Sequence, residues 1–193
     1  MTTPQEVLEF WLDEVGPAGW YKQSDALDAT IRDRFGPALQ SASEGTYGLW
    51  LTYPTGVLAY IILMDQFPRN MFRGEARSFA TDTHGLAAAK MAIHHGWDKR
   101  IDTPARQFFY LPLMHSENLC DQERCIRLML DRMPDVEDNL LHARAHREVI
   151  RQFGRFPYRN EALSRCSTGP EKHYLDQGGY GATLRDLQKA DAA

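Results

Sequence analysis

The chain has 193 residues, of which 43% are hydrophobic and 25% are charged, as in an ordinary globular domain. Its formal net charge of −4 argues against a protein that binds nucleic acid through bulk positive charge. The N-terminal segment has no signal-like pattern, and the longest apolar run, Val57–Met64, is far shorter than the ~20 residues that a membrane span needs. We therefore expect a soluble, cytoplasmic protein with no nucleic-acid and no membrane partner.

The three cysteines, Cys120, Cys125 and Cys166, favour the same location. Their number is odd and no two of them form a C-x-x-C pair, so we expect neither a disulfide framework nor a structural zinc site. Reduced cysteines are the rule in the cytoplasm.

Predicted helices follow one another along the chain, and no segment alternates in the way that is typical of a strand. The first helix begins at Pro4 behind a Thr3 cap, and the second begins near Ser24. Pro54 opens a third helix, which is apolar on every side and therefore belongs in the core. Later helices are predicted over residues 80–95, from residue 103 onward, and over residues 118–132, 134–153 and 168–175.

No composition shift or linker divides the sequence. We therefore expect a single all-α domain over residues 1–177, built from antiparallel helical hairpins joined by short loops. The last segment, GGYGATLRDLQKADAA over residues 178–193, is interpreted as a loosely ordered C-terminal tail.

A first polar motif, DQFPRN over residues 65–70, follows the most apolar helix. Because the residue before a proline avoids the α conformation, we expect this helix to end near Gln66. Asp65 would then lie in the last turn, where the helix macrodipole disfavours a carboxylate, and a buried carboxylate there needs a partner or a proton. Arg69 follows four residues later, and Gln66 and Asn70 add amide donors.

A second motif, GRFPYRN over residues 154–160, repeats this pattern. Its glycine ends a helix, Arg155 and Arg159 flank Phe-Pro, and Asn160 follows. Between the two motifs, a third helix end carries His115 and Glu117 in the sequence HSEN. Three helix ends therefore place charged and amide side chains beside apolar runs.

Isolated buried charges are too unfavourable to be scattered singly through a core, so we expect these helix ends to meet. His142 and His146 are four residues apart on a helix and share one face, and His146 is expected to point to the same place. The predicted polar pocket is about 10–15 Å across, a size suited to a small ligand. It is expected to hold the side chains of Asp65, His115, His146 and Arg155.

Three segments carry a family resemblance: DQFPRNMFRG (65–74), FFYLPLMHSE (108–117) and HREVIRQFGRFPYRN (146–160). They resemble the bacterial family labelled domain of unknown function 924, and the resemblance runs from Val7 to Leu175. It implies a bacterial protein with a tetratricopeptide-like all-helical fold, and it implies no activity. The chain has Tyr158 where members usually have histidine and Ser164 where they usually have glycine, so residue 158 is expected to have a supporting role.

The candidate residues have a structural and a functional interpretation. Asp65 and Arg69 form either a buried structural ion pair or part of a ligand site. His115 and Glu117 form either a general acid–base pair or a satisfied helix terminus. Carboxylates and histidines could also hold a metal, but the neighbouring arginines repel cations and attract anions, so no metal site is predicted.

The functional interpretation assigns the residues to two sets. Catalytic proton transfer is assigned to Asp65, His115, Glu117 and His146. Ligand binding is assigned to Gln66, Arg69, Asn70, Arg155, Arg159 and Asn160.

Two classes of function fit these observations. The first is a helical domain whose polar Arg/His/Asp/Glu pocket binds or transforms a small anionic ligand. The second is a tetratricopeptide-like module that binds a peptide or protein partner and has no catalytic activity. The unusual polar residues stand in apolar sequence context, which favours the small-ligand pocket. The sequence identifies no cofactor and leaves open whether the protein is an enzyme.

Overall fold

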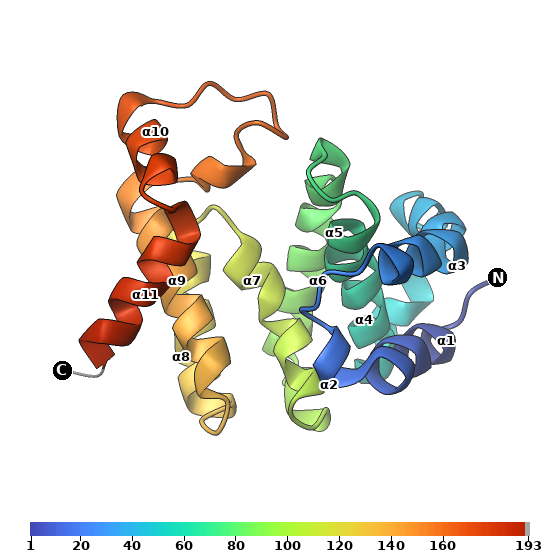
Figure 1. Ribbon diagram of the computed structural model, residues 1–193. Coiled ribbons are helices and arrows are strands. Elements are labelled where there is room, and N and C mark those ends of the chain that lie inside the picture. The colour runs from blue at the N-terminus through green and yellow to red at the C-terminus, as the bar shows by residue number, and fades with distance from the viewer. Residues whose placement is uncertain (192–193) are drawn as a thin grey trace. The chain divides into compact units, whose positions relative to one another are not determined.

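The computed structural model describes residues 1–191, and every regular element within them is a helix (Figure 1). The all-helical class is therefore confirmed. The chain divides into two compact units, unit 1 (Met1–Pro112) and unit 2 (Leu113–Ala193), and the single domain expected over residues 1–177 stays a prediction. The division falls inside a helix, so no linker composition marks it in the sequence. Within residues 1–191, no helix combines the length and the apolar character needed to cross a membrane.

Unit 1 alternates α-helices with short 3-10 and π-helical segments. Three predicted helix starts are confirmed, because Thr3 caps α1, Ser24 caps α3 and Pro54 opens α4. The elements in chain order are α1 (Pro4–Leu8), η1 (Glu9–Val15), α2 (Gly16–Gly19), α3 (Asp25–Ser43), η2 (Gly48–Thr52), α4 (Pro54–Ile61), η3 (Ile62–Gln66), α5 (Phe67–Met71), η4 (Ala76–Phe79), α6 (Asp82–His94), η5 (Trp97–Arg100) and η6 (Ala105–Phe109).

The centre of unit 1 is α4, which packs against α1, α6 and η2. Every residue of the apolar run Val57–Met64 is buried, as the sequence predicts for a core helix. Aromatic rings extend this core, with ring centres 5.5 Å apart for Trp11 and Phe67 and 6.2 Å apart for Trp11 and Phe108. The first polar motif therefore begins directly beside the main apolar core of unit 1.

The helix expected to end near Gln66 continues instead through the first motif. The π-helical segment η3 follows α4 and leads into α5, which has Pro68 in its first turn. In an α-helix the Met64 carbonyl would accept a hydrogen bond from residue 68, but proline has no N–H. That carbonyl accepts from the Thr81 hydroxyl instead. The helix-end prediction was wrong because a π turn and a side-chain donor accommodate the proline.

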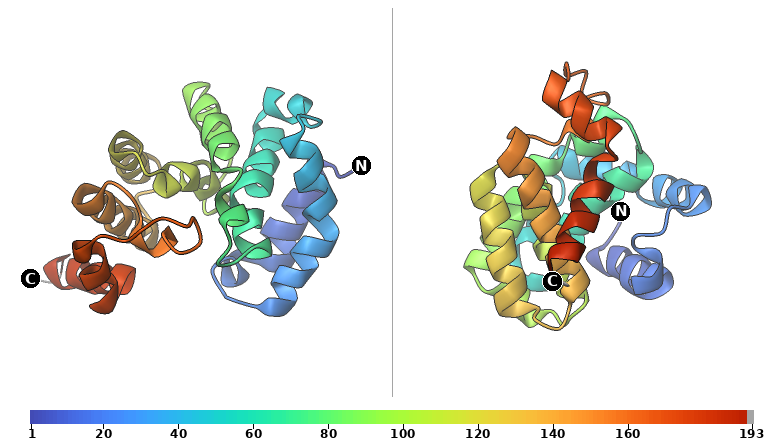
Figure 2. Two further views of the ribbon diagram at one scale, coloured as in Figure 1. Left: turned by 90° about the horizontal axis from the view of Figure 1, so that it is seen from above. Right: turned by 60° about the vertical axis from the view of Figure 1, so that its left-hand side comes forward.

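Unit 2 begins within α7 and is built around a helical hairpin. Helices α8 and α9 pack against each other, and α11 packs along α9 (Figures 1 and 2). As predicted, Gly154 ends α9, with the left-handed φ of 69° that favours glycine, and a capping box at Thr168 begins α10. The elements are α7 (Leu111–His115), α8 (Leu119–Arg132), α9 (Glu137–Phe153), η7 (Pro157–Arg159), α10 (Gly169–Asp176) and α11 (Gly179–Asp191).

The segment interpreted as a loosely ordered tail, residues 178–193, instead contains α11, and residues 192–193 lie outside the described part of the chain. Tyr180, Leu184 and Leu187 follow helical spacing and are partly buried. This apolar face packs against α9 and α10. The helix was missed because three glycines precede and interrupt its first turn. Its presence brings Tyr180 into the candidate site.

Candidate functional site

The first motif lies in unit 1, where ion pairs connect it to α6. Asp65, on η3, is 2% exposed, and its carboxylate lies 3.5 Å from Arg69 Nη1. Arg69 donates to both carboxylate oxygens of Asp82 on α6, at 2.8 and 3.0 Å, and to the Asp65 carbonyl at 2.7 Å. Two carboxylates therefore hold one guanidinium. These contacts support the interpretation of Asp65 and Arg69 as a structural ion pair that ties one helical segment to its neighbour.

The amides of the first motif continue this network. Gln66 donates from Nε2 to Asn70 Oδ1 at 2.9 Å, and Asn70 donates from Nδ2 to Asp28 Oδ1 at 2.9 Å. Arg73 pairs with the same carboxylate. Burial raises the pKa of Asp28, but the hydrogen bonds from Arg73 and Asn70 outweigh it and leave that pKa below its ordinary value. Both ends of the Asn70 amide are thus used inside unit 1.

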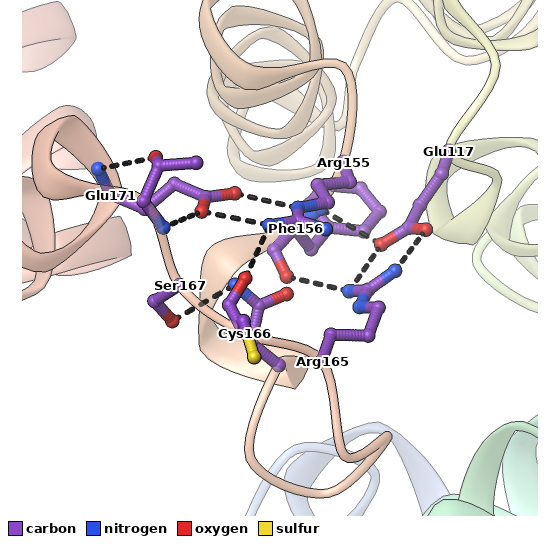
Figure 3. Close-up of polar contacts among 9 residues, drawn as sticks. Glu117, Arg155, Phe156, Arg165, Cys166, Ser167 and Glu171 are labelled. Atoms are coloured by element: carbon purple, nitrogen blue, oxygen red, sulfur yellow. Dashed lines mark hydrogen bonds and ion pairs between the residues drawn. The ribbon is translucent and has the colours of Figure 1, made fainter.

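The second motif lies in unit 2, where Glu117 fixes the loop that follows α9 (Figure 3). Arg165 donates to both carboxylate oxygens of Glu117, at 2.7 and 3.0 Å, and the Phe156 N–H donates to one of them at 2.8 Å. Arg165 also donates to the Phe156 carbonyl at 3.1 Å. Burial raises the pKa of Glu117, but the hydrogen bonds from Arg165 and Phe156 outweigh it and leave the pKa lowered. Glu117 is therefore an ionised group that holds the loop.

Arg155 closes the other side of the same loop by pairing with α10 (Figure 3). It donates from Nε and Nη2 to the two oxygens of Glu171, at 2.6 and 2.8 Å, and to the Cys166 carbonyl at 2.9 Å. Glu171 is 2% exposed and also accepts from the Thr168 N–H at 2.7 Å. The hydrogen bonds from Arg155 and Thr168 hold the pKa of Glu171 far below its usual range. Arg155 is thus committed to an internal ion pair.

Imidazole and aromatic rings gather between three helices of unit 2. The ring centre of His146, on α9, is 6.4 Å from that of His115, 5.5 Å from that of Phe156 and 4.8 Å from that of Tyr180. His142, one helical turn before His146, stacks on Tyr180 at 6.0 Å. Phe156 is fully buried, whereas the other four side chains are partly or wholly exposed. We call these five residues the histidine cluster.

The electrostatic surroundings keep His146 neutral. Burial lowers the pKa of this imidazole to about 3, and its hydrogen bond to the His142 carbonyl opposes that shift only in part. The charge of Arg159 lowers the pKa further, as do His115 and His142 when they are protonated. His146 is therefore an uncharged imidazole near neutral pH, in surroundings whose potential favours negative charge.

Arg159 borders the histidine cluster on the loop side, and Asn160 follows it in the chain. Arg159, on η7, is 6% exposed, and its guanidinium lies 4.4 Å from the centre of the Phe156 ring. Asn160 is 1% exposed and donates to Ser167 Oγ at 3.1 Å, while its Oδ1 has no hydrogen-bond partner within residues 1–191. An unpaired buried acceptor costs about 1–3 kcal/mol. The loop therefore contains a buried acceptor that no group within residues 1–191 satisfies.

The predicted residues thus fall into two groups. Asp65, Gln66, Arg69 and Asn70 lie in unit 1, and His115, Glu117, His146, Arg155, Arg159 and Asn160 lie in unit 2. The expectation that Asp65 shares one pocket with His115, His146 and Arg155 stays a prediction. In the part of the chain that the structure describes, no group of three or more histidine, cysteine, aspartate or glutamate side chains is arranged to hold a metal ion.

Three residues of unit 2 were not among the predicted site residues. Glu171 was assigned only to a helix cap, although a capping-box glutamate close to Phe-Pro-Tyr-Arg could have been paired with a nearby arginine. Arg165 follows Ser164, whose φ of 52° turns the chain back toward Glu117. Tyr180 was missed because its segment was interpreted as a loose tail. The i, i+4 and i+7 spacing of α11 was the signal that could have identified it.

Comparison with known proteins places this geometry in a family. A family model described as "Bacterial protein of unknown function (DUF924)" matches residues 7–179. A solved structure of a protein of unknown function from Agrobacterium tumefaciens is similar to this chain, with 38% sequence identity and a TM-score of 0.85 over 91% of this chain and 97% of the other. No match was found among the curated proteins. The matched residues include both Phe-Pro motifs and end one residue before Tyr180.

Proposed function

The chain belongs to the family of bacterial proteins of unknown function DUF924, and on that premise we propose that the histidine cluster, together with Arg159, binds a small anionic ligand. The observation that carries this proposal is the convergence of side chains from α7, α9, η7 and α11 around His146. Separate elements supply imidazole, phenol and guanidinium groups to one partly exposed place within unit 2. A purely structural core would not need this many polar rings at its edge.

The charges around His146 support an anion in particular. His146 is neutral, and the groups whose positive charge lowers its pKa are Arg159 and, when they are protonated, His115 and His142. An anion bound among these groups would be stabilised by the same potential. Arg159 is our candidate for the main contact because a guanidinium binds carboxylate and phosphate oxygens in pairs.

The other arginines have a different role in this proposal. Arg155 donates to Glu171, and Arg165 donates to Glu117. These two ion pairs fix the loop that carries Phe156 and Arg159, so they orient the ligand site without binding the ligand. Arg69 has the same structural character in unit 1, where it pairs with Asp82.

Binding is better supported than proton transfer. A general base works best when its pKa lies near the operating pH, whereas burial lowers the pKa of His146 to about 3. Glu117 is held by Arg165 as a carboxylate. Catalysis by His115 is part of the proposal only if the bound anion is found to react.

Calorimetric titration tests this proposal with phosphate, sulfate, a dicarboxylate, zinc and manganese as probes. We expect at least one anion to bind and both metals to leave the protein unchanged. Arg159→Gln should weaken anion binding by roughly tenfold to a hundredfold, the effect of losing a charge-assisted hydrogen bond. Tight metal binding without any anion effect would contradict the proposal.

A matched control is Arg151→Gln. Arg151 lies in the last turn of α9, has a side chain that is 56% exposed and pairs only loosely with Glu148 at 3.2 Å. The same change of charge at this position should leave anion affinity unaltered. Thermal unfolding of both variants shows whether Arg159→Gln is still folded at the titration temperature.

A second candidate function is a tetratricopeptide-like module that binds a peptide. Support comes from the α8–α9 hairpin and the packing of α11 on α9, together with two exposed leucines on α8. Leu119 and Leu130 are 43% and 50% exposed, and eleven residues of α-helix bring them to within about 20° of the same direction. If all the small probes fail to bind while a Leu119→Glu, Leu130→Glu variant loses a partner that the wild type retains, this candidate replaces the first.

We also propose that the protein is cytoplasmic. Cys120 and Cys166 are exposed free cysteines, and exposed thiols are usually reduced in a reducing compartment. Fractionation of cells that express the tagged chain tests this location.

A further inference from the structure

A chain of hydrogen bonds fixes where the proton of His146 lies. His146 Nδ1 is 2.8 Å from the backbone carbonyl oxygen of His142 and 3.2 Å from the Tyr180 hydroxyl. The same hydroxyl is 2.6 Å from His142 Nδ1. One phenol from α11 thus bridges two imidazoles that are one turn apart on α9.

The contact with the backbone carbonyl decides the tautomer of His146. A carbonyl oxygen can only accept, so His146 Nδ1 carries the proton and donates to the His142 carbonyl. The Tyr180 oxygen then also accepts from His146 Nδ1–H, and it either donates its own proton to His142 Nδ1 or accepts from a protonated His142 Nδ1. In the neutral ring of His146, the second nitrogen, Nε2, therefore has a lone pair and no proton.

This tautomer limits the kind of anion that can bind beside His146. A fully deprotonated oxyanion presents only lone pairs, and the Nε2 lone pair would face one of them in a repulsive contact. An oxyanion that retains a proton can donate that proton to Nε2 while its other oxygens accept from Arg159.

We infer that the ligand of the histidine cluster is an oxyanion that carries a proton at neutral pH, of which hydrogen phosphate is the simplest, and that His146 Nε2 is the acceptor that selects it. This inference rests on the proposed anion-binding function. It adds the class of ligand and names His146 as the residue that determines specificity. Tyr180 and the His142 carbonyl act as positioning groups that hold the tautomer.

Phosphate and sulfate are the probes that separate this inference from the function it rests on. The two ions have similar size and shape, but at about pH 7.5 phosphate retains a proton and sulfate has none. We expect phosphate to bind at least about tenfold more tightly than sulfate, since one charge-assisted hydrogen bond is replaced by a repulsive contact. Equal affinities would overturn the inference and leave the proposed function standing. If neither ion binds, the inference and the proposed function are both overturned.

A phosphate monoester distinguishes free phosphate from an esterified source. Its second proton is lost with a pKa of about 6, so at about pH 7.5 phenyl phosphate resembles sulfate and should bind as weakly. At about pH 5.5 it regains a proton and should bind more tightly. A monoester that binds at the higher pH as tightly as phosphate does would overturn the inference.

The matched variants are His146→Gln and His142→Gln. A glutamine amide at position 146 can turn either its oxygen or its N–H toward the anion, so the preference for phosphate over sulfate should fall to within about threefold. The same substitution at position 142 retains the backbone carbonyl that fixes the His146 tautomer, and it should leave the preference intact. Equal loss of preference in both variants would contradict the assignment.

The nitrogen-15 chemical shifts of the His146 ring give a readout that needs no ligand. We expect Nδ1 to have the shift of a protonated nitrogen and Nε2 that of an unprotonated one in the unliganded protein. Tyr180→Phe should retain this tautomer, because the His142 carbonyl still accepts. A proton on Nε2 in the wild type would overturn the inference, whether or not the variants fold.

Discussion

The two Phe-Pro motifs have nearly the same sequence and lie on different backbones. In unit 1, Phe67 and Pro68 continue a helical path from η3 into α5. In unit 2, Gly154 ends α9, Phe156 is extended with φ −90° and ψ 105°, and only a short 3-10 turn follows. The difference follows from what precedes each proline, a π turn in one case and a helix-ending glycine in the other.

The two backbones use the same side chains differently. Asn70 is buried with both ends of its amide hydrogen bonded, whereas the buried Asn160 has an Oδ1 without a partner within residues 1–191. Arg69 donates to a carboxylate of α6 with both terminal nitrogens, whereas the guanidinium of Arg159 lies over an aromatic ring beside the histidine cluster. We conclude that the first motif stabilises its unit, and the proposed ligand site lies beside the second.

The largest effect that tests this comparison is expected from Arg69→Ala. The substitution removes a guanidinium from two carboxylates, one of which is only 2% exposed. We expect the free energy of unfolding to fall by about 3 kcal/mol, near the lower end of the range for breaking a buried ion pair. Urea denaturation measures the loss.

The control for Arg69 is Arg77→Ala. Arg77 is exposed, and its guanidinium lies 3.8 Å from the Phe72 ring centre. An exposed cation–π contact contributes only about 0.5–1 kcal/mol, so this variant should lose much less stability. Similar small losses in both variants would mean that the first motif is not a stabilising network.

The second effect is the pH dependence of stability that His146 produces in unit 2. Burial lowers the pKa of this imidazole to about 3 in the folded protein, against about 6.5 in an unfolded chain. Below about pH 6.5 the unfolded state therefore binds more protons, so stability should fall as pH falls from 6.5 toward 3, by at most about 1.4 kcal/mol per pH unit. His146→Gln should have a shallower slope between about pH 7 and 5.

Denaturant midpoints across this pH range measure the slope, and His173→Gln is the control. His173 is an exposed residue of α10, and its replacement should leave the wild-type slope in place. A His146→Gln variant whose stability follows the wild-type pH curve would show that folding does not lower the pKa of His146.

A third effect is expected at Arg155. Arg155→Ala should lower the Tm by a few degrees, because Glu171 is buried and Arg155 donates two hydrogen bonds to it. This ion pair lowers the pKa of Glu171 in the folded protein. The stability that the pair contributes is therefore complete above the pKa of glutamate in the unfolded chain, about 4.3, and it is lost as the pH falls below that value. The Tm difference between wild type and variant should thus shrink in acid. A larger Tm difference at low pH would contradict this sign, and Arg151→Ala serves as the exposed control.

The smallest effect is expected from Ser164→Gly, which should stabilise the protein. Ser164 has φ 52°, in the left-handed region that costs a non-glycine residue about 1–2 kcal/mol. Glycine adds about 0.4–1 kcal/mol of backbone entropy to the unfolded chain, so we expect a net gain of about 0.5 kcal/mol. Ser43→Gly, at the end of α3, should instead destabilise the protein. Thermal unfolding of both variants decides whether the turn before Arg165 is strained.

Helix starts were the part of the fold that the sequence predicted well, because a cap is a local signal. Thr3, Ser24 and Thr168 each place a side-chain oxygen within reach of a backbone N–H three residues later. The continuation of the helix through Pro68 was missed because the donor that satisfies the Met64 carbonyl, Thr81, is distant in sequence. A rule that considers only the residues next to a proline cannot predict that hydrogen bond.

For the candidate site, the sequence named several residues but did not predict which charged groups they pair with. His115, Glu117, His146 and Arg159 were all named from the sequence, but the carboxylate that Arg155 pairs with and the guanidinium that Glu117 pairs with were not. Both partners, Glu171 and Arg165, come from the chain beyond the second motif, where loop geometry decides which charges meet. Tyr180 was not predicted, because the glycines around it made its helix difficult to recognise in the sequence.

The most direct test of the account is a phosphate titration followed by the backbone and side-chain NMR signals of the whole chain. If the second motif borders the ligand site and the first is structural, saturating shifts should concentrate at His115, His146, Phe156, Arg159 and Tyr180, while the signals of residues 65–70 stay unchanged. Shifts centred on residues 65–70, with the histidine cluster silent, would contradict it.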